Sequence, residues 1–576
     1  MTRRRAPYVD GCDRGRGMGQ RIQVVRIQTF MFLFLVATTL QAQVTHERML
    51  HADREPQNWL TYSGGYASMR YSELTQIDRG NVKGLQLKWV HVFDTPKKIE
   101  NTPLVVDGVM YTGDVNQIEA VDAVTGRTYW TLRHTVDPRG VFVLPMLKGL
   151  AVSGNKLFWA TLDGHLIAVD TKNGQPLWDT TVAVWQKGYQ LNVAPLVVKN
   201  KVILGPATNE EGANCWVAAF DIKTGKELWR FNATPSPGEP GNDTWPANSW
   251  KHGGGSIWVT GSYDPETNLT YWGTGNPNPG WNGDPRSPGD NLYTDSVLAL
   301  DADTGKLKWY YQFTPNDEFD WDAVEIPVLA DINWEGKPRK VLLWANRNGF
   351  FYVLDRTTGK FLLGKPFVKQ NWNIGFNENG RPIKAPDFKA TAEGTFIEPG
   401  VQGGTNWYSP SYSPRTGLFY VSSWQNGSQI SAKAPAVWVE GERYTGVGHP
   451  AHPPAARPNR GGGLATGNYG NASSFKTEAE GYGATIAIDP QTGEKKWEFK
   501  MVDFTETGVL TTASDVLFSG GREGNFFALD ARTGEPLWKV GLGSSVASGP
   551  MTYSVDGHQY VAVCAGNILY VFGLPQ

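Results

Sequence analysis

The chain has few cysteines and almost no net charge. Its 576 residues include 3 Cys, and 54 Lys and Arg stand against 56 Asp and Glu, for a formal charge of −2. Nucleic-acid-binding proteins carry a basic footprint, so this balance predicts no nucleic-acid partner. The sequence has no Cys-x-x-Cys-His motif, which excludes a c-type haem attached to it. A disulfide between Cys215 and Cys564 is possible, but their spacing does not predict one.

Long apolar runs are also scarce. The strongest, Phe30–Leu40, is too short to span a bilayer but has the length of a signal-peptide core. It follows basic residues between Arg21 and Arg26, and Ala42 offers a cleavage site. We therefore predict a signal peptide over residues 1–42 and a periplasmic mature chain over residues 43–576. The basic region is long enough that Met18 is a candidate start, and an uncleaved N-terminal anchor is the alternative.

One short sequence pattern recurs along the rest of the chain. It has a small residue, Asp two places on, then Thr-Gly or Asn-Gly, and finally Trp. Such self-similarity indicates a repeat architecture. The six copies are Ala120–Trp130, Ala168–Trp178, Ala219–Trp229, Ala299–Trp309, Ala487–Trp497 and Ala528–Trp538. Val353–Leu363 is a seventh with Leu in place of Trp, and Trp89 marks an eighth unit.

Each copy reads as a β-hairpin. The apolar run before Asp is strand-like, and the residues after Gly alternate into a returning strand. Asp accepts hydrogen bonds from turn amides, and Gly supplies a positive φ. A Trp in the returning strand provides a large flat ring for packing between neighbouring sheets. Because one such sheet cannot bury both faces, we expect the copies to stack as one large all-β unit.

Two long excursions interrupt the repeats. Phe231–Gly255 is rich in Pro, Gly and Trp, and Trp424–Gly481 contains the stretch GHPAHPPAARPNRGGG. The second composition predicts no regular structure. Long loops in a compact domain are commonly functional, so we expect both to wall a binding pocket.

The repeat resembles the tryptophan-docking motif of the eight-bladed quinoprotein alcohol dehydrogenases, which use pyrroloquinoline quinone (PQQ). The resemblance covers residues 50–576 and includes the methanol and ethanol dehydrogenases. It implies an all-β, eight-bladed β-propeller that oxidises a small alcohol to an aldehyde. It also implies PQQ and one metal ion as cofactors, and a soluble cytochrome c as electron acceptor. The sequence leaves open whether the chain forms a homodimer.

The acidic stretch Thr314–Asp322 (TPNDEFDWD) resembles the family's catalytic segment. Alternation places Asp320 and Asp322 on one side of an extended chain, where two carboxylates repel unless a cation or a shared proton lies between them. The resemblance makes Asp320 the general base and a metal ligand. Asp322, typical of the lanthanide-using branch, is a further ligand that suits a highly charged cation. The resemblance implies a lanthanide or Ca²⁺ as the metal. The alternative interpretation of this stretch is a solvated acidic loop without a function.

Two more metal ligands follow from the resemblance. Gly205–Gly212 (GPATNEEG) matches the stretch that ends in a ligand Glu, here Glu210, with Glu211 as the rival one position on. Gly273–Pro279 (GTGNPNP) matches the segment whose first Asn, here Asn276, binds the metal. A surface acidic pair and a Gly/Pro-rich turn are the non-functional alternatives.

The cofactor contacts are likewise implied by matching segments. Trp258, in GGGSIW, corresponds to the floor on which the quinone lies, and Arg347 to the residue that binds its oxygens through a guanidinium fork. The remaining predicted cofactor-binding residues are Glu100, Lys148, Asn192, Asn406 and Trp407.

One departure from the family lies in Val141–Leu150 (VFVLPMLKGL). The family has two adjacent cysteines that form a disulfide above the cofactor, whereas this chain has Phe142 and Val143. Lys148 stands where the family has Arg, and it offers a less directional charge. An apolar lid is therefore expected in place of the disulfide.

Two other functions fit the repeat. Scaffold proteins of bacterial envelope assembly use the same tryptophan-docking propeller without catalysis, and an idle quinone-binding sensor is a third reading. Neither requires the acidic cluster around Asp320 together with Glu210 and Asn276. We therefore favour the enzyme.

Overall fold

The computed structural model describes residues 43–140, 142–208, 210–449 and 481–575. The predicted signal peptide and much of the second excursion lie outside these residues. Val44–Gln576 forms one compact unit, which is the part of the chain considered below. Within the described residues there is a single α-helix, α2 (His46–Leu50), and no helix long and apolar enough to cross a membrane. The all-β prediction is confirmed.

Eight sheets of four or five strands make up most of the described chain, as many as the repeat units counted in the sequence. Each contains mainly antiparallel neighbours in sequence order. The first four sheets comprise β3 (Leu104–Val106), β4 (Val109–Gly113), β5 (Gln117–Asp122) and β6 (Thr128–Arg133); β7 (Ala151–Ser153), β8 (Lys156–Ala160), β9 (His165–Asp170) and β10 (Pro176–Thr181); β12 (Leu196–Val198), β13 (Lys201–Leu204), β15 (Trp216–Asp221) and β16 (Glu227–Asn232); and β17 (Ser262–Asp264), β18 (Leu269–Gly273), β19 (Ser296–Asp301) and β20 (Leu307–Gln312).

The other four sheets follow the same plan, with two exceptions. One carries an extra parallel strand, β1, and the last takes its fourth strand, β2, from the start of the unit. These sheets comprise β21 (Val328–Trp334), β22 (Lys337–Ala345), β23 (Phe350–Asp355) and β24 (Phe361–Pro366); β28 (Ser411–Ser413), β29 (Leu418–Gln425), β32 (Tyr482–Ile488) and β33 (Lys495–Lys500); β1 (Tyr71–Ser72), β34 (Leu510–Thr512), β35 (Val516–Gly520), β36 (Asn525–Asp530) and β37 (Pro536–Gly541); and β38 (Met551–Val555), β39 (His558–Ala565), β40 (Ile568–Gly573) and β2 (Gln86–Val92).

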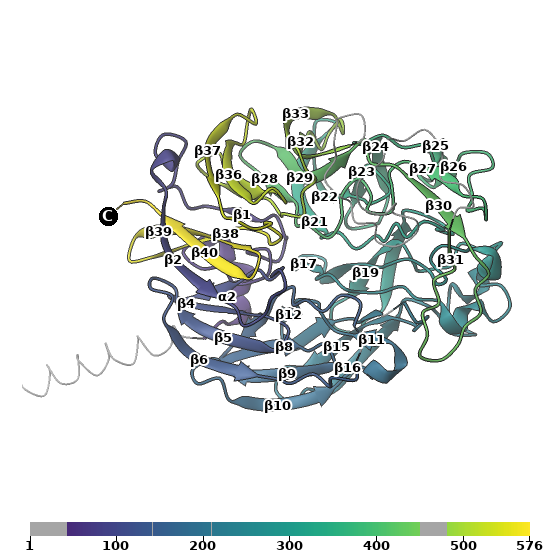
Figure 1. Cartoon of the computed structure of the whole chain (residues 1–576), viewed down its shortest axis with the longest axis horizontal. Helices are drawn as coiled ribbons and strands as arrows, with labels where there is room; N and C mark the ends of the chain where they lie inside the picture. Colours follow the sequence, from purple (N-terminus) through teal and green to yellow (C-terminus); the bar gives the residue numbers. More distant parts are fainter. Residues whose placement is uncertain (1–42, 141, 209, 450–480, 576) are drawn as a thin grey trace, which may run out of the picture. The chain divides into compact units, whose positions relative to one another are not determined.

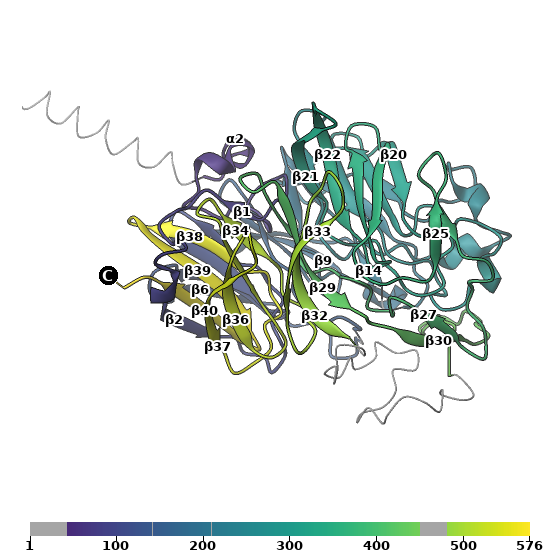
Figure 2. The same cartoon turned by 90° about the horizontal axis from the view of Figure 1, so that it is seen from above.

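The sheets are arranged radially around a centre. Figure 1 shows first strands such as β12 and β17 near the centre, and fourth strands such as β10 and β6 at the rim. Strand β2 pairs antiparallel with β40, so that residues from the two ends of the unit complete one sheet. In Figure 2, α2 lies on one side of this ring and β30 (Gln429–Lys433) toward the other.

The repeated sequence forms the hairpin between the third and fourth strands of a sheet. In the first copy, Ala120 of β5 pairs with Trp130 of β6. Asp122 Oδ1 accepts hydrogen bonds from the amides of Val124 and Thr125 at 2.9 Å each, and Gly126 has a φ of +73°. The turn chemistry expected from the sequence is therefore observed.

The Trp of each hairpin contacts the following sheet. Trp130 Nε1 donates to Thr171 O at 2.9 Å, and its ring lies over Gly174, where an added Cβ would come within 2.6 Å of the ring. Equivalent Nε1 donations join Trp89 to Ala123 O, Trp178 to Ile222 O, Trp229 to Ala302 O and Trp497 to Ala531 O. The same turn that ends one hairpin thus receives the Trp of its neighbour.

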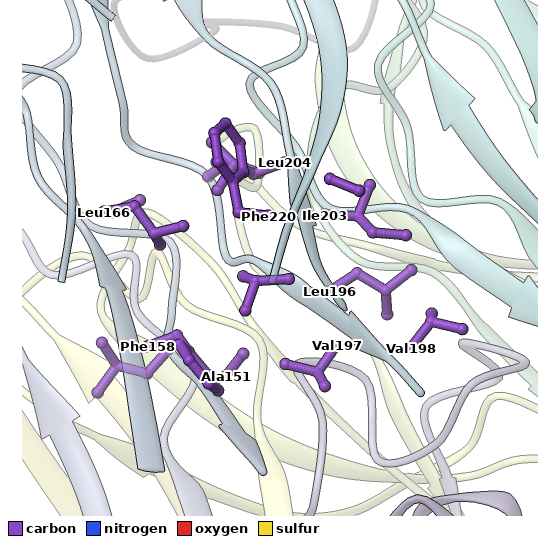
Figure 3. Packing of buried hydrophobic residues seen from close by; sticks show 14 of the residues in the cluster. Ala151, Phe158, Leu166, Leu196, Val197, Val198, Ile203, Leu204 and Phe220 are labelled. Atoms are coloured by element: carbon purple, nitrogen blue, oxygen red, sulfur yellow. The ribbon is translucent and has the colours of Figure 1, made fainter. Parts of the chain in front are cut away.

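Apolar side chains fill the space between adjacent sheets. Figure 3 shows Phe158 and Leu166 of the second sheet near Leu196, Ile203 and Phe220 of the third. All five are buried, as expected for residues whose strands pack face to face. This packing makes the ring a rigid support for the loops at its ends.

The two excursions are only partly irregular. The first contains 3₁₀ turns at Asn242–Thr244 and Ser249–His252. In the second, β30 and β31 (Val447–Gly448) pair with each other, and β30 pairs with β27 (Thr395–Ile397). The prediction that the second excursion lacks regular structure was wrong for these residues, because main-chain pairing with a distant strand supplies the hydrogen bonds.

Candidate active site

Four of the predicted site residues occupy the same position relative to a sheet. Trp258 lies four residues before β17, Glu100 four before β3, Asn192 four before β12, and Trp407 four before β28. Each of these residues therefore lies in the loop that enters the first strand of its own sheet, and Figure 1 shows first strands such as β12 and β17 toward the centre of the ring. Trp258 and Trp407 indeed belong to one buried apolar cluster.

Lys148 links the two tryptophans to Glu100. Its Nζ lies 3.2 Å from the ring centroid of Trp407 and 5.3 Å from that of Trp258, and it donates to Glu100 Oε2. Lys98 Nζ contacts the other oxygen of Glu100 at 3.2 Å. Burial lowers the pKa of Lys148 to about 8, although Glu100 favours the charged form. Burial alone would raise the pKa of Glu100, but the positive charges of Lys148 and Lys98 outweigh it and hold that pKa below its usual value.

Arg347 brings the two predicted metal-binding aspartates together. Its Nη1 donates to Asp322 Oδ2 at 2.9 Å, and its Nη2 contacts Asp320 Oδ2 at 3.3 Å. Asp320 has a φ of +59°, so the segment is not the extended chain assumed from alternation. The two carboxylates do converge, but a guanidinium lies between them. Asp322 also accepts from Trp258 Nε1 at 3.1 Å and from the backbone amide of Asn276 at 2.6 Å.

Burial raises the pKa of Asp320 well above its usual range. Arg347 opposes this rise, while the negative charges of Asp322, Glu210 and Asp317 add to it. A raised pKa increases the affinity of the deprotonated carboxylate for a proton, which is the property that a general base uses. The Asp320 side chain is 2% exposed, so its carboxylate contacts groups inside the site and not bulk solvent.

The structure distinguishes the two candidate glutamates. Glu210 Oε2 accepts from Asn278 Nδ2 at 3.3 Å, and its charge acts on Asp320. Glu211 instead lines a cavity of about 250 Å³ with Lys187. Glu210 is thus the one that faces the site.

One buried polar side chain that sequence reasoning missed, Gln190, lies two residues before the predicted Asn192. Both side-chain atoms of Gln190, like those of Asn192, are buried without a hydrogen-bond partner among the described residues. The two residues are i and i+2, the spacing that places side chains on one face of a strand, and this spacing could have pointed to Gln190. Gln190 pairs across β11 (Tyr189–Gln190) and β14 (Ala207–Thr208) with Ala207, a member of the Trp258–Trp407 cluster.

Asp295 and Glu325 are two further buried acidic residues, and nothing in the repeat pattern indicates that they belong to the site. Both oxygens of Asp295 lack a partner among the described residues, and burial, then Asp317 and Asp322, raises its pKa well above the usual range. Glu325 accepts from the backbone amide of Arg347 at 2.8 Å, and burial raises its pKa to about 8. Glu325 thus fixes the segment that carries Arg347.

The remaining predicted residues are arranged as follows. Asn406 Oδ1 accepts from the amide of Trp407 at 2.8 Å. Phe142 packs edge-on against Trp185 at 6.3 Å between ring centroids. Cys215 and Cys564 are free and buried. A larger cavity, of about 500 Å³, lies elsewhere and includes none of the predicted site residues.

The residues present fit a planar, anionic cofactor and a cation. Indole faces, an ammonium group and unpartnered amides are complementary to a flat ring that carries carboxylates. The negative charges of Asp322 and Glu210 raise the pKa of Asp320, a repulsion that a bound cation would relieve. Within the described ranges, no group of three or more His, Cys, Asp or Glu side chains is spaced to hold a metal as it stands. Asn276 would have to complete the ligand set.

Comparison with known proteins identifies the family. The family described as "Glucose/ethanol/alcohol dehydrogenase, beta-propeller domain" of PQQ enzymes matches residues 59–366 and 378–561. The chain belongs to this family. It is 38% identical to the quinohemoprotein alcohol dehydrogenase of Comamonas testosteroni over 90% of this chain and 73% of that protein. It is 34% identical to the lanthanide-dependent methanol dehydrogenase of Methylacidiphilum fumariolicum over 95% and 91%.

Solved structures of PQQ enzymes are similar as well. A europium-containing methanol dehydrogenase aligns with a TM-score of 0.81 at 31% identity, covering 92% of this chain and all of that one (100%). The β-propeller fold is thereby shown, and the protein is a PQQ-dependent alcohol oxidoreductase. Since the relatives are enzymes, the enzymatic prediction is favoured over the scaffold.

Proposed function

We propose that this quinoprotein oxidises a primary alcohol to an aldehyde in the periplasm, with PQQ and a lanthanide or Ca²⁺ ion. The observation that carries the proposal is the buried Asp320, linked by Arg347 to Asp322 and adjacent to Glu210. The names of two relatives support a lanthanide, one as lanthanide-dependent and one as europium-containing.

Each residue of the site has its own role in this reaction. Asp320 takes the hydroxyl proton of the alcohol at Oδ2, and Arg347 balances its charge before that transfer. Glu210, Asn276, Asp320 and Asp322 would hold the metal, and Trp258 would lie against the cofactor ring. When bound, PQQ supplies the electron acceptor and the metal supplies Lewis acidity. The buried site excludes water, which strengthens these electrostatic interactions.

The other cofactor residues bind its polar edge. Lys148 and Glu100 offer a charged pair, and Asn192, Asn406 and Gln190 offer amide donors and acceptors. Trp407 covers the Lys148 ammonium through a cation–π contact. Phe142 and Val143 stand where the family has its adjacent cysteines, so we propose that an apolar cover replaces the disulfide.

The electrons taken from the alcohol then pass to a separate carrier protein. The sequence has no Cys-x-x-Cys-His motif, whereas the first relative is named a quinohemoprotein. We propose a soluble cytochrome c as the acceptor, and residues 1–42 as the signal peptide that directs export.

Reconstitution tests the function and the metal. The mature chain is titrated with PQQ and either La³⁺ or Ca²⁺, and dye reduction is followed with a panel of primary alcohols. Activity with La³⁺ that Asp322→Ala abolishes supports the lanthanide. Activity with Ca²⁺ alone keeps the enzyme and refutes the lanthanide preference. Absence of PQQ binding with either ion would refute the proposed function.

A further inference from the structure

The segment between β30 and β31, residues 434–446, spans two loops of the site. We call it the brace. Its base is closed by a hydrogen bond from Ala434 N to Gly446 O at 2.8 Å. One loop that it contacts, residues 205–212, carries Glu210, and the other, residues 273–284, carries Asn276. Nothing in the alcohol-oxidation chemistry requires such a segment, so its contacts need another explanation.

On the first loop, the brace binds the main chain at Glu210 and Glu211. Tyr444 N donates to Glu210 O at 2.6 Å, and Trp438 Nε1 donates to Glu211 O at 2.9 Å. Glu210 has a φ of +63°, a left-handed conformation that a residue with a side chain adopts only when its surroundings impose it. One of the two hydrogen bonds is accepted by this residue and the other by the next one, so both restrain the main chain where it is left-handed.

An aromatic stack holds the donor of the second hydrogen bond. The ring of Trp438 lies 4.0 Å from that of His252 with an interplanar angle of 15°, and Tyr444 meets His252 edge-on at 6.3 Å. Gly212 lies beneath, where a Cβ would come within 3.0 Å of Tyr444 and 3.1 Å of His252. Trp438 is nevertheless 37% exposed. An exposed Trp with a fixed ring plane and a hydrogen-bonded N–H has a defined orientation.

On the second loop, the brace binds residues that follow Asn276. Trp281 N donates to Thr445 O at 2.9 Å, and Asn282 Nδ2 donates to Ala434 O at 2.8 Å. Next to the brace, Lys433 Nζ contacts Asp284 Oδ1 at 2.6 Å. The brace therefore ties the loop of Glu210 to the loop of Asn276.

We propose that the brace sets the distance between these two ligands and that Trp438 is a positioning residue for Glu210. The inference rests on the proposed function, because it assumes that Glu210 and Asn276 hold the metal. Outer contacts that orient ligands commonly change metal affinity when they are removed, without touching the metal. The brace is then a determinant of metal affinity rather than of the chemistry itself.

The test compares metal binding by Trp438 variants in the PQQ-loaded protein. Trp438→Phe keeps a ring for His252 but loses the Nε1 donor, so Tb³⁺ affinity, measured by equilibrium dialysis, should fall about five-fold. Trp438→Ala loses the stack as well and should weaken binding by about ten-fold or more. Trp334→Phe, at a partly buried Trp near the end of β21, is the matched control and should bind Tb³⁺ as the wild type does.

A second readout separates positioning from general damage. At saturating Tb³⁺ or La³⁺, Trp438→Phe should retain kcat within about two-fold, and its urea midpoint should equal that of Trp334→Phe. Unchanged Tb³⁺ affinity in both Trp438 variants overturns the brace while leaving the alcohol dehydrogenase intact. Absence of Tb³⁺, La³⁺ and Ca²⁺ binding in the wild type overturns the proposed metal site and the brace with it.

Discussion

Substitution of Gly174 by Ala tests the contact between neighbouring sheets. Gly174 ends the turn of the second repeat with a φ of +73°, and an added Cβ would lie 2.6 Å from Cε3 of Trp130. Two effects should therefore add: the left-handed backbone and the displaced indole ring. The ring cannot move freely, because its Nε1 donates to Thr171 O at 2.9 Å.

The two effects can be separated by a control within the same chain. Gly417 has a φ of +70°, but nothing lies within 4 Å of its added Cβ. Gly417→Ala should lower the free energy of unfolding by about 1–2 kcal/mol, the backbone contribution alone. Gly174→Ala adds overpacking of about 1–3 kcal/mol, for a total of about 2–5 kcal/mol.

Urea unfolding followed by circular dichroism measures the difference. Gly174→Ala in a Trp130→Leu background should cost only the backbone contribution, because the ring that the methyl group meets is gone. The two substitutions should thus be strongly non-additive. If Gly174→Ala is no more destabilising than Gly417→Ala, the Trp ring does not hold the sheets together as described.

Three further predictions concern the site. Asp320→Asn should lower kcat by about 10²–10⁴-fold with PQQ binding retained, since the amide cannot take the alcohol's proton; a kcat within a few-fold of the wild type would exclude Asp320 as the base. Because burial lowers the pKa of Lys148 to about 8, the ammonium is charged below that pH and neutral above it, so PQQ affinity should fall as pH rises through about 8. Lys148→Arg should remove this dependence, because guanidinium stays charged, and a titration curve unchanged by the substitution would assign the effect elsewhere. Gln190→Ala and Asn192→Ala should each weaken PQQ binding about five-fold in fluorescence titrations, and an unaffected Gln190 variant would show that its amide faces no ligand.

Much of the fold could be predicted from the repeat, because its information is local. Asp122, Gly126 and Trp130 specify a turn and a contact to the next turn within a few residues. The pairing of β2 with β40 could not be predicted in this way. It joins residues almost five hundred positions apart, and no periodicity links them.

The site was predicted as a set of residues but not as an arrangement. Family segments located Asp320 and Asp322, whereas their convergence depends on Arg347, which follows β22, and on a left-handed backbone at Asp320. Gln190 escaped notice because a polar residue in a strand is ordinary until both of its amide atoms are found buried without partners. Burial of that kind is a property of the packed structure.

The sheet completed by β2 has a consequence for the way this protein forms. Strand β2 precedes all seven full copies of the repeat, yet its partner β40 is synthesised after all of them. During folding, β2 must therefore remain with an unpaired edge while seven sheets assemble. An open edge invites pairing with other chains, and a closure over so long a separation is slow. The exposed Leu87, Val90 and Val92 on β2 make this strand the place where an incomplete ring would aggregate first.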